Sequence, residues 1–331
     1  MSGIPSTLAS PALDRRSLLL GAGALALAAP SLVGTAHAQA YPSTMVRLIV
    51  PFTAGSMTDI LARSLAEKLR EKWGQNVIVE NRPGISGTGG VARSAPDGLT
   101  LMLTSNGHAV IKAVNREITF DPVTDFVAIA KVASMPSILI APPDGPIDSL
   151  VKLIAAAKAQ PGALNYASAG LGSSTGIAAE VLRAATGLSM VLVPYRGMPE
   201  SQTAVLRGDA AMAFTFFNVG GDLIQAGRLR ALAVTGETRM AQLPNVPTFR
   251  EAGLADFTYD AWFGVLGPAG LPKAIVDKVN ADINAALMAD DMKTRFTGQG
   301  VNLQGATPEA FAATLKADAE RYGPLVRGQG S

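Results

Sequence analysis

Apolar runs of strand length alternate with segments of helical period from about residue 41 onward. The first unit is a buried-strand run, VRLIVPF at 46–52, followed by a segment at 58–74 whose apolar residues recur every three or four positions before Gly74. The other elements expected before residue 108 are a strand at 76–84, a short helix and turn at 87–98, and a strand at 99–107. Strands alternating with helices predict an α/β fold with mostly parallel sheets.

The same alternation repeats in the second part of the chain. The expected strands lie at 134–145, 164–170, 190–197, 209–217, 229–236 and 260–272. The expected helices lie at 149–162, 174–187, 199–208, 220–227, 272–300 and 307–328. No long linker separates these elements, so the pattern predicts strand–loop–helix units packed in sequence.

One strand–loop–helix unit is echoed later in the chain. The segment GSMTDILARSL at 55–65 aligns without gaps to GSSTGIAAEVL at 172–182, and each copy follows an apolar strand and opens a helix. Two such units predict two α/β lobes with equivalent loops. The alternative is chance similarity among small residues.

The two loops have the composition of an anion site. Ligands of open α/β sheets bind beyond the carboxyl ends of the strands, and a helix N-terminus there offers unpaired N–H groups and partial positive charge. Gly55 and Gly172 let the backbone approach a ligand. The nearby hydroxyl groups belong to Ser56, Thr58, Ser173, Ser174 and Thr175. These residues could instead only cap their helices, but two matching loops favour an anion site.

Two other functions fit the second loop on spacing alone. Gly172-x-Ser174-x-Gly176 matches the nucleophile elbow of an α/β-hydrolase, but that triad needs a later His, and none follows residue 108. Gly170, Gly172 and Gly176 approach a dinucleotide fingerprint. The next strand lacks the acidic residue expected for a ribose hydroxyl, although Arg196 could meet a 2′-phosphate.

Composition narrows the chemistry further. The 331 residues are 48% hydrophobic and 16% charged, with net charge +2 and 5% aromatic residues, which gives little support for nucleic-acid binding. The chain has no cysteine, so disulfides, Fe–S clusters and thiol catalysis are excluded. Of the two histidines, we expect only His108 in the mature chain, as a partly exposed residue at a helix start, and we expect no metal or cofactor.

The first 38 residues have the pattern of an export signal. Arg15-Arg16 precede an apolar stretch that ends near Ala29, and Ala36-His37-Ala38 fits a cleavage site. The apolar stretch is too short for a membrane span. The twin arginines fit either twin-arginine or ordinary secretory export, and we expect the mature chain to start near Gln39.

Several motifs carry a resemblance to a known family. The segments RLIVPFTAGSMTDILARSL, ENRPG at 80–84, LNYASAGLGSS, VPYRG and PNVPT at 244–248 resemble the Bug family, the periplasmic receptors of tripartite tricarboxylate transporters. The resemblance covers the mature chain and implies a two-lobe protein, type II-like, that closes on a small carboxylate. It implies that the first loop, 52–59, and the YASAG loop, 168–174, hold the ligand carboxylate.

The candidate ligand-binding residues follow from these loops and the strand ends beside them. They are Phe52, Thr53, Ala54, Gly55, Ser56, Thr58, Asp59, Ser105, Asn106, Ser168, Ala169, Gly170, Gly172, Ser173, Ser174, Tyr195, Thr215 and Phe216. We expect Tyr195 to line the cleft and Arg82 to have a structural role at a turn.

The sequence departs from the family pattern in three places. Ser56 follows Gly55 where the family has a second glycine, no histidine follows the second loop, and Phe214, Phe216 and Phe217 replace a pattern with an aspartate. These phenylalanines either line the pocket, where they would suit an aromatic or longer carboxylate, or belong to the core.

We therefore expect a periplasmic solute-binding protein and not an enzyme. Lobe one is expected at 39–141 plus 260–331 and lobe two at 142–259, with hinge segments at 137–143 and 259–266. The expected partners are a small carboxylate and the membrane subunits of a tripartite tricarboxylate transporter, with no nucleic acid and a monomeric receptor. An exported NADP-linked oxidoreductase is the alternative.

Overall fold

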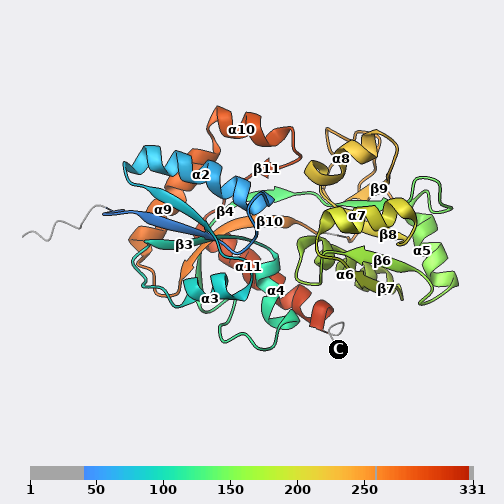
Figure 1. Ribbon diagram of the computed structural model, residues 1–331, viewed down its shortest axis with the longest axis horizontal. Helices are drawn as coiled ribbons and strands as arrows, with labels where there is room; N and C mark the ends of the chain where they lie inside the picture. The colour runs from blue at the N-terminus through green and yellow to red at the C-terminus, as the bar shows by residue number, and fades with distance from the viewer. Residues whose placement is uncertain (1–40, 258, 328–331) are drawn as a thin grey trace, which may run out of the picture. The chain divides into compact units, whose positions relative to one another are not determined.

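The computed structural model describes residues 41–257 and 259–327 (Figure 1). The expected export signal, its cleavage site and His37 lie outside the described residues. None of the helices in the described part combines the length and apolar character needed to cross a bilayer.

The first sheet has six strands and is built from both ends of the described chain (Figure 1). In spatial order its strands are β11 (Asn302–Leu303), β4 (Phe126–Met135), β10 (Ala261–Pro268), β3 (Thr100–Ser105), β1 (Val46–Val50) and β2 (Val77–Asn81). The strands β1 to β4 run in one direction, and β10 and β11 run in the other.

Helices cover both faces of this sheet. The helices α2 (Met57–Trp73) and α9 (Lys273–Leu287) contact each other and one face, and α10 (Asp290–Thr297) follows α9. The helices of the other face are α3 (Ile85–Ala92), α4 (Gly107–Val114) and α11 (Pro308–Arg327). Strand β1 shows why both faces are covered, because Leu48 and Val50 pack with Leu61 of α2 whereas Ile49 packs with Phe311 of α11.

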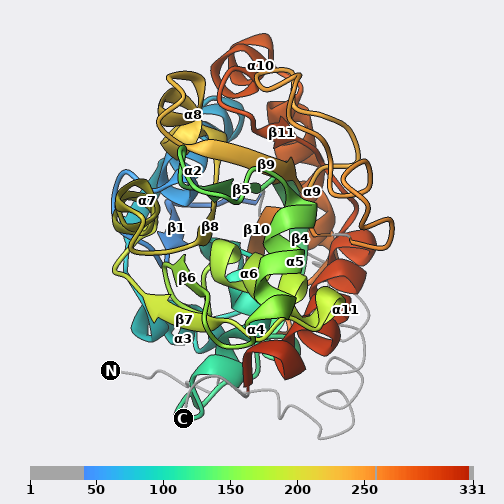
Figure 2. The ribbon, with the colours of Figure 1, turned by 90° about the vertical axis from the view of Figure 1, so that its right-hand side faces the viewer.

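The second sheet has five strands and its own pair of helical layers (Figure 2). In spatial order its strands are β7 (Val191–Pro194), β6 (Asn165–Ser168), β8 (Met212–Thr215), β5 (Ile138–Ala141) and β9 (Arg230–Val234). Its helices are α5 (Leu150–Ala159), α6 (Ser174–Thr186), α7 (Met198–Arg207) and α8 (Phe217–Gln225). Side chains of α5 and α6 pack in one hydrophobic cluster with the sheet, and those of α7 and α8 pack in another.

The strands that follow the two crossings between the sheets, β5 and β10, run antiparallel to their neighbours. Strand β5 follows β4 without a crossover helix and runs antiparallel to β8 and β9, whereas β6, β7 and β8 run parallel. Because β5 belongs to the second sheet, the first crossing lies between Met135 and Ile138, ahead of the expected boundary at residue 141. The return crossing leads into β10 at Ala261.

The sequence pattern missed or merged some elements. Strand β4 was not expected, although its run FVAIAKVASM is almost wholly buried. The helix start expected at His108 is confirmed, because α4 begins at Gly107. The helix expected at 272–300 is two helices, because Ala289 has extended backbone angles (φ −63°, ψ 138°) and α10 begins anew at Asp290.

Candidate functional site

The loop between β1 and α2 turns sharply into a capped helix. Ser56 is extended (φ −66°, ψ 158°), and its Oγ accepts a hydrogen bond from the Asp59 amide at 3.3 Å, which is the geometry of an N-cap. Gly55 has φ 81°, a backbone conformation that L side chains rarely adopt. The predicted helix start is confirmed.

Asp59 closes this first loop from within. Its carboxylate accepts hydrogen bonds from the Gly55 amide at 2.9 Å, from Asn81 Nδ2 at 2.9 Å and from Arg63 Nε at 3.1 Å. Burial acts to raise the pKa of this carboxyl, but the hydrogen bonds from Arg63, Gly55 and Asn81 together hold it below the usual value. Asp59 therefore stays ionised and shapes the loop. Its oxygens are bound to donors from the loop, from α2 and from β2.

The loop between β6 and α6 caps its helix in the same way but closes differently. Ser173 Oγ accepts from the Gly176 amide at 3.0 Å and donates to the Gly170 carbonyl at 2.7 Å, and Ser168 Oγ donates to the same carbonyl at 3.3 Å. A Cβ added at Gly176 would lie 2.1 Å from that carbonyl oxygen. Gly176 and the left-handed Gly170 (φ 100°) are thus the glycines that this loop requires.

Both helix starts keep unpaired amides. Within 41–257 and 259–327, the amides of Met57 and Thr58 at the start of α2 have no hydrogen-bond acceptor, and neither have those of Ser174 and Thr175 at the start of α6. Such groups carry the positive end of the helix dipole. The two loops can therefore offer backbone donors to an anion.

The side chain of Ser174 is not an activated nucleophile. Its hydroxyl donates to Asn106 Oδ1 at 2.5 Å, and an amide oxygen is not a base that can take its proton in catalysis. This geometry contradicts the hydrolase interpretation of the Gly172-x-Ser174-x-Gly176 spacing.

His108 is buried, contrary to the expectation of a partly exposed histidine. It is 3% exposed, because α4 packs its ring edge-on against Phe126. Its Nε2 lies 2.9 Å from the Pro122 carbonyl oxygen, and burial lowers its pKa to about 4. The imidazole is therefore neutral at pH 7.

The residues at the end of β8 and directly after it belong mainly to the core. Phe214 stacks on Phe249 at 6.0 Å between ring centroids, and Phe216 is 4% exposed. The Thr215 hydroxyl accepts a hydrogen bond from Gln202 Nε2. Phe214 is thus a core residue of the second lobe, and Thr215 joins β8 to α7.

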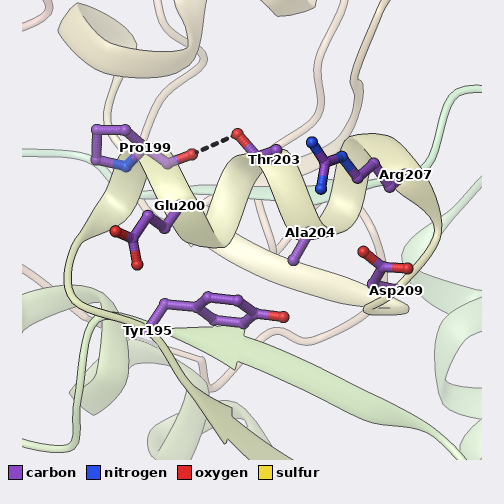
Figure 3. A pocket seen from close by; sticks show the side chains of 7 residues that line it. All are labelled: Tyr195, Pro199, Glu200, Thr203, Ala204, Arg207 and Asp209. Atoms are coloured by element: carbon purple, nitrogen blue, oxygen red, sulfur yellow. Dashed lines mark hydrogen bonds between the residues drawn. The ribbon is translucent and has the colours of Figure 1, made fainter.

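Tyr195 lies against α7, and its backbone amide donates to the Ser168 carbonyl at the start of the second loop. Figure 3 shows its ring beneath this helix, in a surface pocket of about 390 Å³. The residues that share the pocket are Pro199, Glu200, Thr203, Ala204, Arg207 and Asp209. The Tyr195 side chain packs against the cluster of α7 and α8, and its expected place in the ligand cleft stays a prediction.

The two arginines that were candidates for carboxylate pairing also differ. Arg82 pairs with Glu80 at 2.7 Å, next to the Arg47–Glu80 pair, which fits its expected structural role. The Arg196 side chain is exposed, and its backbone amide donates to Glu200 at the start of α7.

The remaining candidates lie on the loops or at the end of β3. Phe52 and Ala169 are half-buried, Thr53, Ala54 and Gly172 are exposed, and Ser105 is buried. Asn106 is fully buried and comes directly before α4. Tyr259 falls in the expected hinge segment 259–266 but was not among the candidates, and its hydroxyl accepts a hydrogen bond from Asn106 Nδ2 at 2.8 Å.

A family model described as "Tripartite tricarboxylate transporter family receptor" matches residues 61–330. The chain belongs to this receptor family. Among curated relatives it is 33% identical to Protein BugT of Bordetella pertussis over 318 residues, 95% of this chain and 98% of the relative.

Solved structures of receptors agree with this assignment. The chain is 32% identical to Rpa4515 of R. palustris, solved with adipate, with a TM-score of 0.75 over 88% of this chain and 98% of that one. It is 30% identical to MatC of Rhodopseudomonas palustris, solved with bound malate, with a TM-score of 0.74 over 86% of this chain and all (100%) of that one. These matches confirm the two-lobe periplasmic binding protein fold and the solute-binding family.

The groups that the described loops offer are hydrogen-bond donors. Across the described ranges, no group of His, Asp and Glu side chains is arranged to hold a metal ion. The donors gathered at the loops are backbone amides and hydroxyls, which suit the recognition of an anion.

Proposed function

We propose that this receptor binds a small dicarboxylate between the loops that start α2 and α6. The observation that carries the proposal is the pair of matched helix starts, at Ser56 and Ser173, each followed by two amides without an acceptor among the described residues. A carboxylate can meet such amides with charge-assisted hydrogen bonds. The adipate and malate in the two similar receptors support this ligand class.

The remaining parts of the proposal concern the location, the activity, the oligomeric state and the partners of the receptor. The receptor acts in the periplasm as a monomer without enzymatic activity, and delivers its ligand to the membrane subunits of a tripartite tricarboxylate transporter. Its ligand-holding residues are the loops 52–59 and 168–174. Asp59, Ser168 and Ser173 shape these loops, and the unpaired amides contact the carboxylates.

A proline substitution tests the amides directly. Ser174 is the first residue of α6, where proline fits a helix, and Ser173 before it has the extended angles that proline requires (φ −83°, ψ 152°). Ser174→Pro therefore removes one amide donor with little disturbance of the helix. Ser174→Ala is the matched control, since both variants lose the hydroxyl and only one loses the N–H.

Calorimetry with adipate and with malate gives the readout. Hydrogen bonds to charged groups contribute about 1.5–3 kcal/mol, so Ser174→Pro should bind at least about tenfold more weakly than Ser174→Ala. Equal affinities in the two variants would remove the Ser174 amide from the site. If neither acid, nor any other in a panel of mono-, di- and tricarboxylates, binds the wild type, the proposed ligand class is wrong.

A further inference from the structure

A polar cluster joins the two lobes at the start of α4 and α6. Ser174 Oγ donates to Asn106 Oδ1 at 2.5 Å, Asn106 Nδ2 donates to the Tyr259 hydroxyl at 2.8 Å, and that hydroxyl donates to the Ser174 carbonyl. These three residues, called here the clamp, come from the first lobe, the second lobe and the return crossing. The hydrogen bonds form a closed ring, so each group holds the others in one orientation.

Burial makes the clamp sensitive to the loss of any member. Asn106 is 0% exposed and Tyr259 is 4% exposed, so water cannot readily replace a missing partner. Burial also raises the pKa of Tyr259 well above its ordinary value, so its hydroxyl remains a proton donor.

Beside the clamp, the backbone at the start of α4 also touches the loop before α6. A Cβ added at Gly107, the first residue of α4, would lie 2.2 Å from the carbonyl oxygen of Gly172. The second loop therefore rests directly on α4, and only a glycine at 107 permits this approach.

The clamp occupies the side chain and carbonyl of Ser174 but leaves its amide unpaired. The Ser174 hydroxyl proton goes to Asn106, so this hydroxyl does not donate to a ligand while the clamp is formed. Resting on the proposed function, we propose that Tyr259 is a positioning residue. Through the clamp it fixes the first turn of α6 against the first lobe and so orients the Ser174 amide toward the ligand carboxylate.

The test removes the Tyr259 hydroxyl and compares a neighbouring tyrosine. Tyr259→Phe deletes the hydroxyl that meets both Asn106 Nδ2 and the Ser174 carbonyl, and keeps the ring. Tyr322→Phe is the matched control, because this tyrosine is 3% exposed and its ring lies 5.8 Å from that of Tyr259, yet it is not part of the clamp.

Two measurements report on positioning. The first is the distance between labels on the two lobes of the ligand-free protein, placed by Glu71→Cys on α2 and Lys158→Cys on α5, both exposed positions in a chain without cysteine. The second is the affinity for adipate and malate. Tyr259→Phe should broaden the label distances and weaken binding about threefold to tenfold, the net worth of one hydrogen bond. Tyr322→Phe should change neither.

A second variant disturbs the contact between α4 and the second loop, beside the clamp, without removing a polar group. Gly107→Ala places a methyl group against the Gly172 carbonyl, although alanine itself suits a helix. It should broaden the label distances as Tyr259→Phe does. Gly90→Ala, in α3 where an added Cβ meets nothing within 4 Å, is the control for the change of residue type.

The outcomes separate the clamp from the proposed function. Unchanged label distances in both Tyr259→Phe and Gly107→Ala would overturn the clamp, as would an equal change in Tyr322→Phe. The ligand-free distances test the clamp even if neither acid binds the wild type, in which case only the ligand class fails. Wild-type affinity in Tyr259→Phe together with altered distances would overturn the positioning role.

Discussion

The β1–α2 loop and the β6–α6 loop start their helices alike but are closed by different groups. In both, a serine caps the helix by accepting from the amide three residues later, which is Asp59 in one loop and Gly176 in the other. The first loop is closed by the Asp59 carboxylate, and the second by the Gly170 carbonyl. The N-cap is thus the shared element, and the closing group is specific to each lobe.

This difference has an electrostatic consequence. The first loop contains a buried carboxylate that takes the Gly55 amide and opposes an incoming anion, although Arg63 offsets its charge at 3.0 Å. The second loop is closed by neutral groups. We therefore expect the second loop to contribute more to the binding of a carboxylate than the first.

The largest effect is expected from Gly176→Ala, which tests whether the second loop can carry a side chain at the position where the first loop has one. The position carries a side chain in the first loop, as Asp59, but in the second loop the new Cβ would lie 2.1 Å from the Gly170 carbonyl oxygen. Relief of this overlap should cost about 3 kcal/mol and displace the loop. Urea unfolding and calorimetry should show lower stability and lost binding. Normal binding would show that the Gly170 closure is dispensable.

A smaller loss is expected from Asp59→Asn in the first loop. The amide group keeps the shape but presents an NH₂ to partners that are themselves donors, the Gly55 amide, Asn81 and Arg63. The free energy of unfolding should fall by about 1–2 kcal/mol. Affinity for adipate should fall less than in Gly176→Ala. A greater loss of affinity in Asp59→Asn would reverse the ranking of the loops.

Removing either N-cap side chain should lower the free energy of unfolding by about 1 kcal/mol, so the two caps can be compared directly. Ser56→Ala and Ser173→Ala each remove a side-chain acceptor at a helix start, which typically costs about that much. Ser173 also donates to Gly170, so its loss should cost more, by a few tenths of a kcal/mol up to about 1 kcal/mol. Equal costs in chemical denaturation would show that the Ser173–Gly170 hydrogen bond adds nothing.

The smallest effect is a difference in acid sensitivity. The pKa of Asp59 is lowered in the folded state, so its stabilisation is present above the ordinary value of 3.8 and is lost as the pH falls through the folded-state value. The gap in unfolding free energy between wild type and Asp59→Asn should therefore shrink between pH 6 and pH 3. For Ser173→Ala the gap to wild type should stay constant. A constant gap for Asp59→Asn would show that its charge is not stabilising.

The local parts of the site were predictable from the sequence. Ser56 and Ser173 follow strands and precede helical periods, and N-capping depends on a few neighbouring residues. The left-handed Gly55 and the helix ends at Gly74 and Gly187 are local in the same sense. The internal echo between the loops therefore gave the right geometry for both helix starts.

The remaining features depend on residues far apart in the chain. The Tyr259 hydroxyl meets the Ser174 carbonyl across 85 positions, and no local pattern marks that tyrosine. Strand β4 was missed although its run is apolar and buried, because only Pro136 and Ser137 separate it from β5.

The position of β10 has a consequence for the order in which the two sheets can assemble from the N-terminus onward. Strand β10 lies between β4 and β3, so the two halves of the first sheet share no strand pairing until residues 261–268 have emerged. All strands of the second sheet fall within 138–234, so its contacts close over shorter stretches of chain. An N-to-C emerging polypeptide can complete the second lobe first, while β1, β2 and β3 wait as a partial sheet with an open edge. A chaperone that covers the β3 edge would protect this intermediate from aggregation.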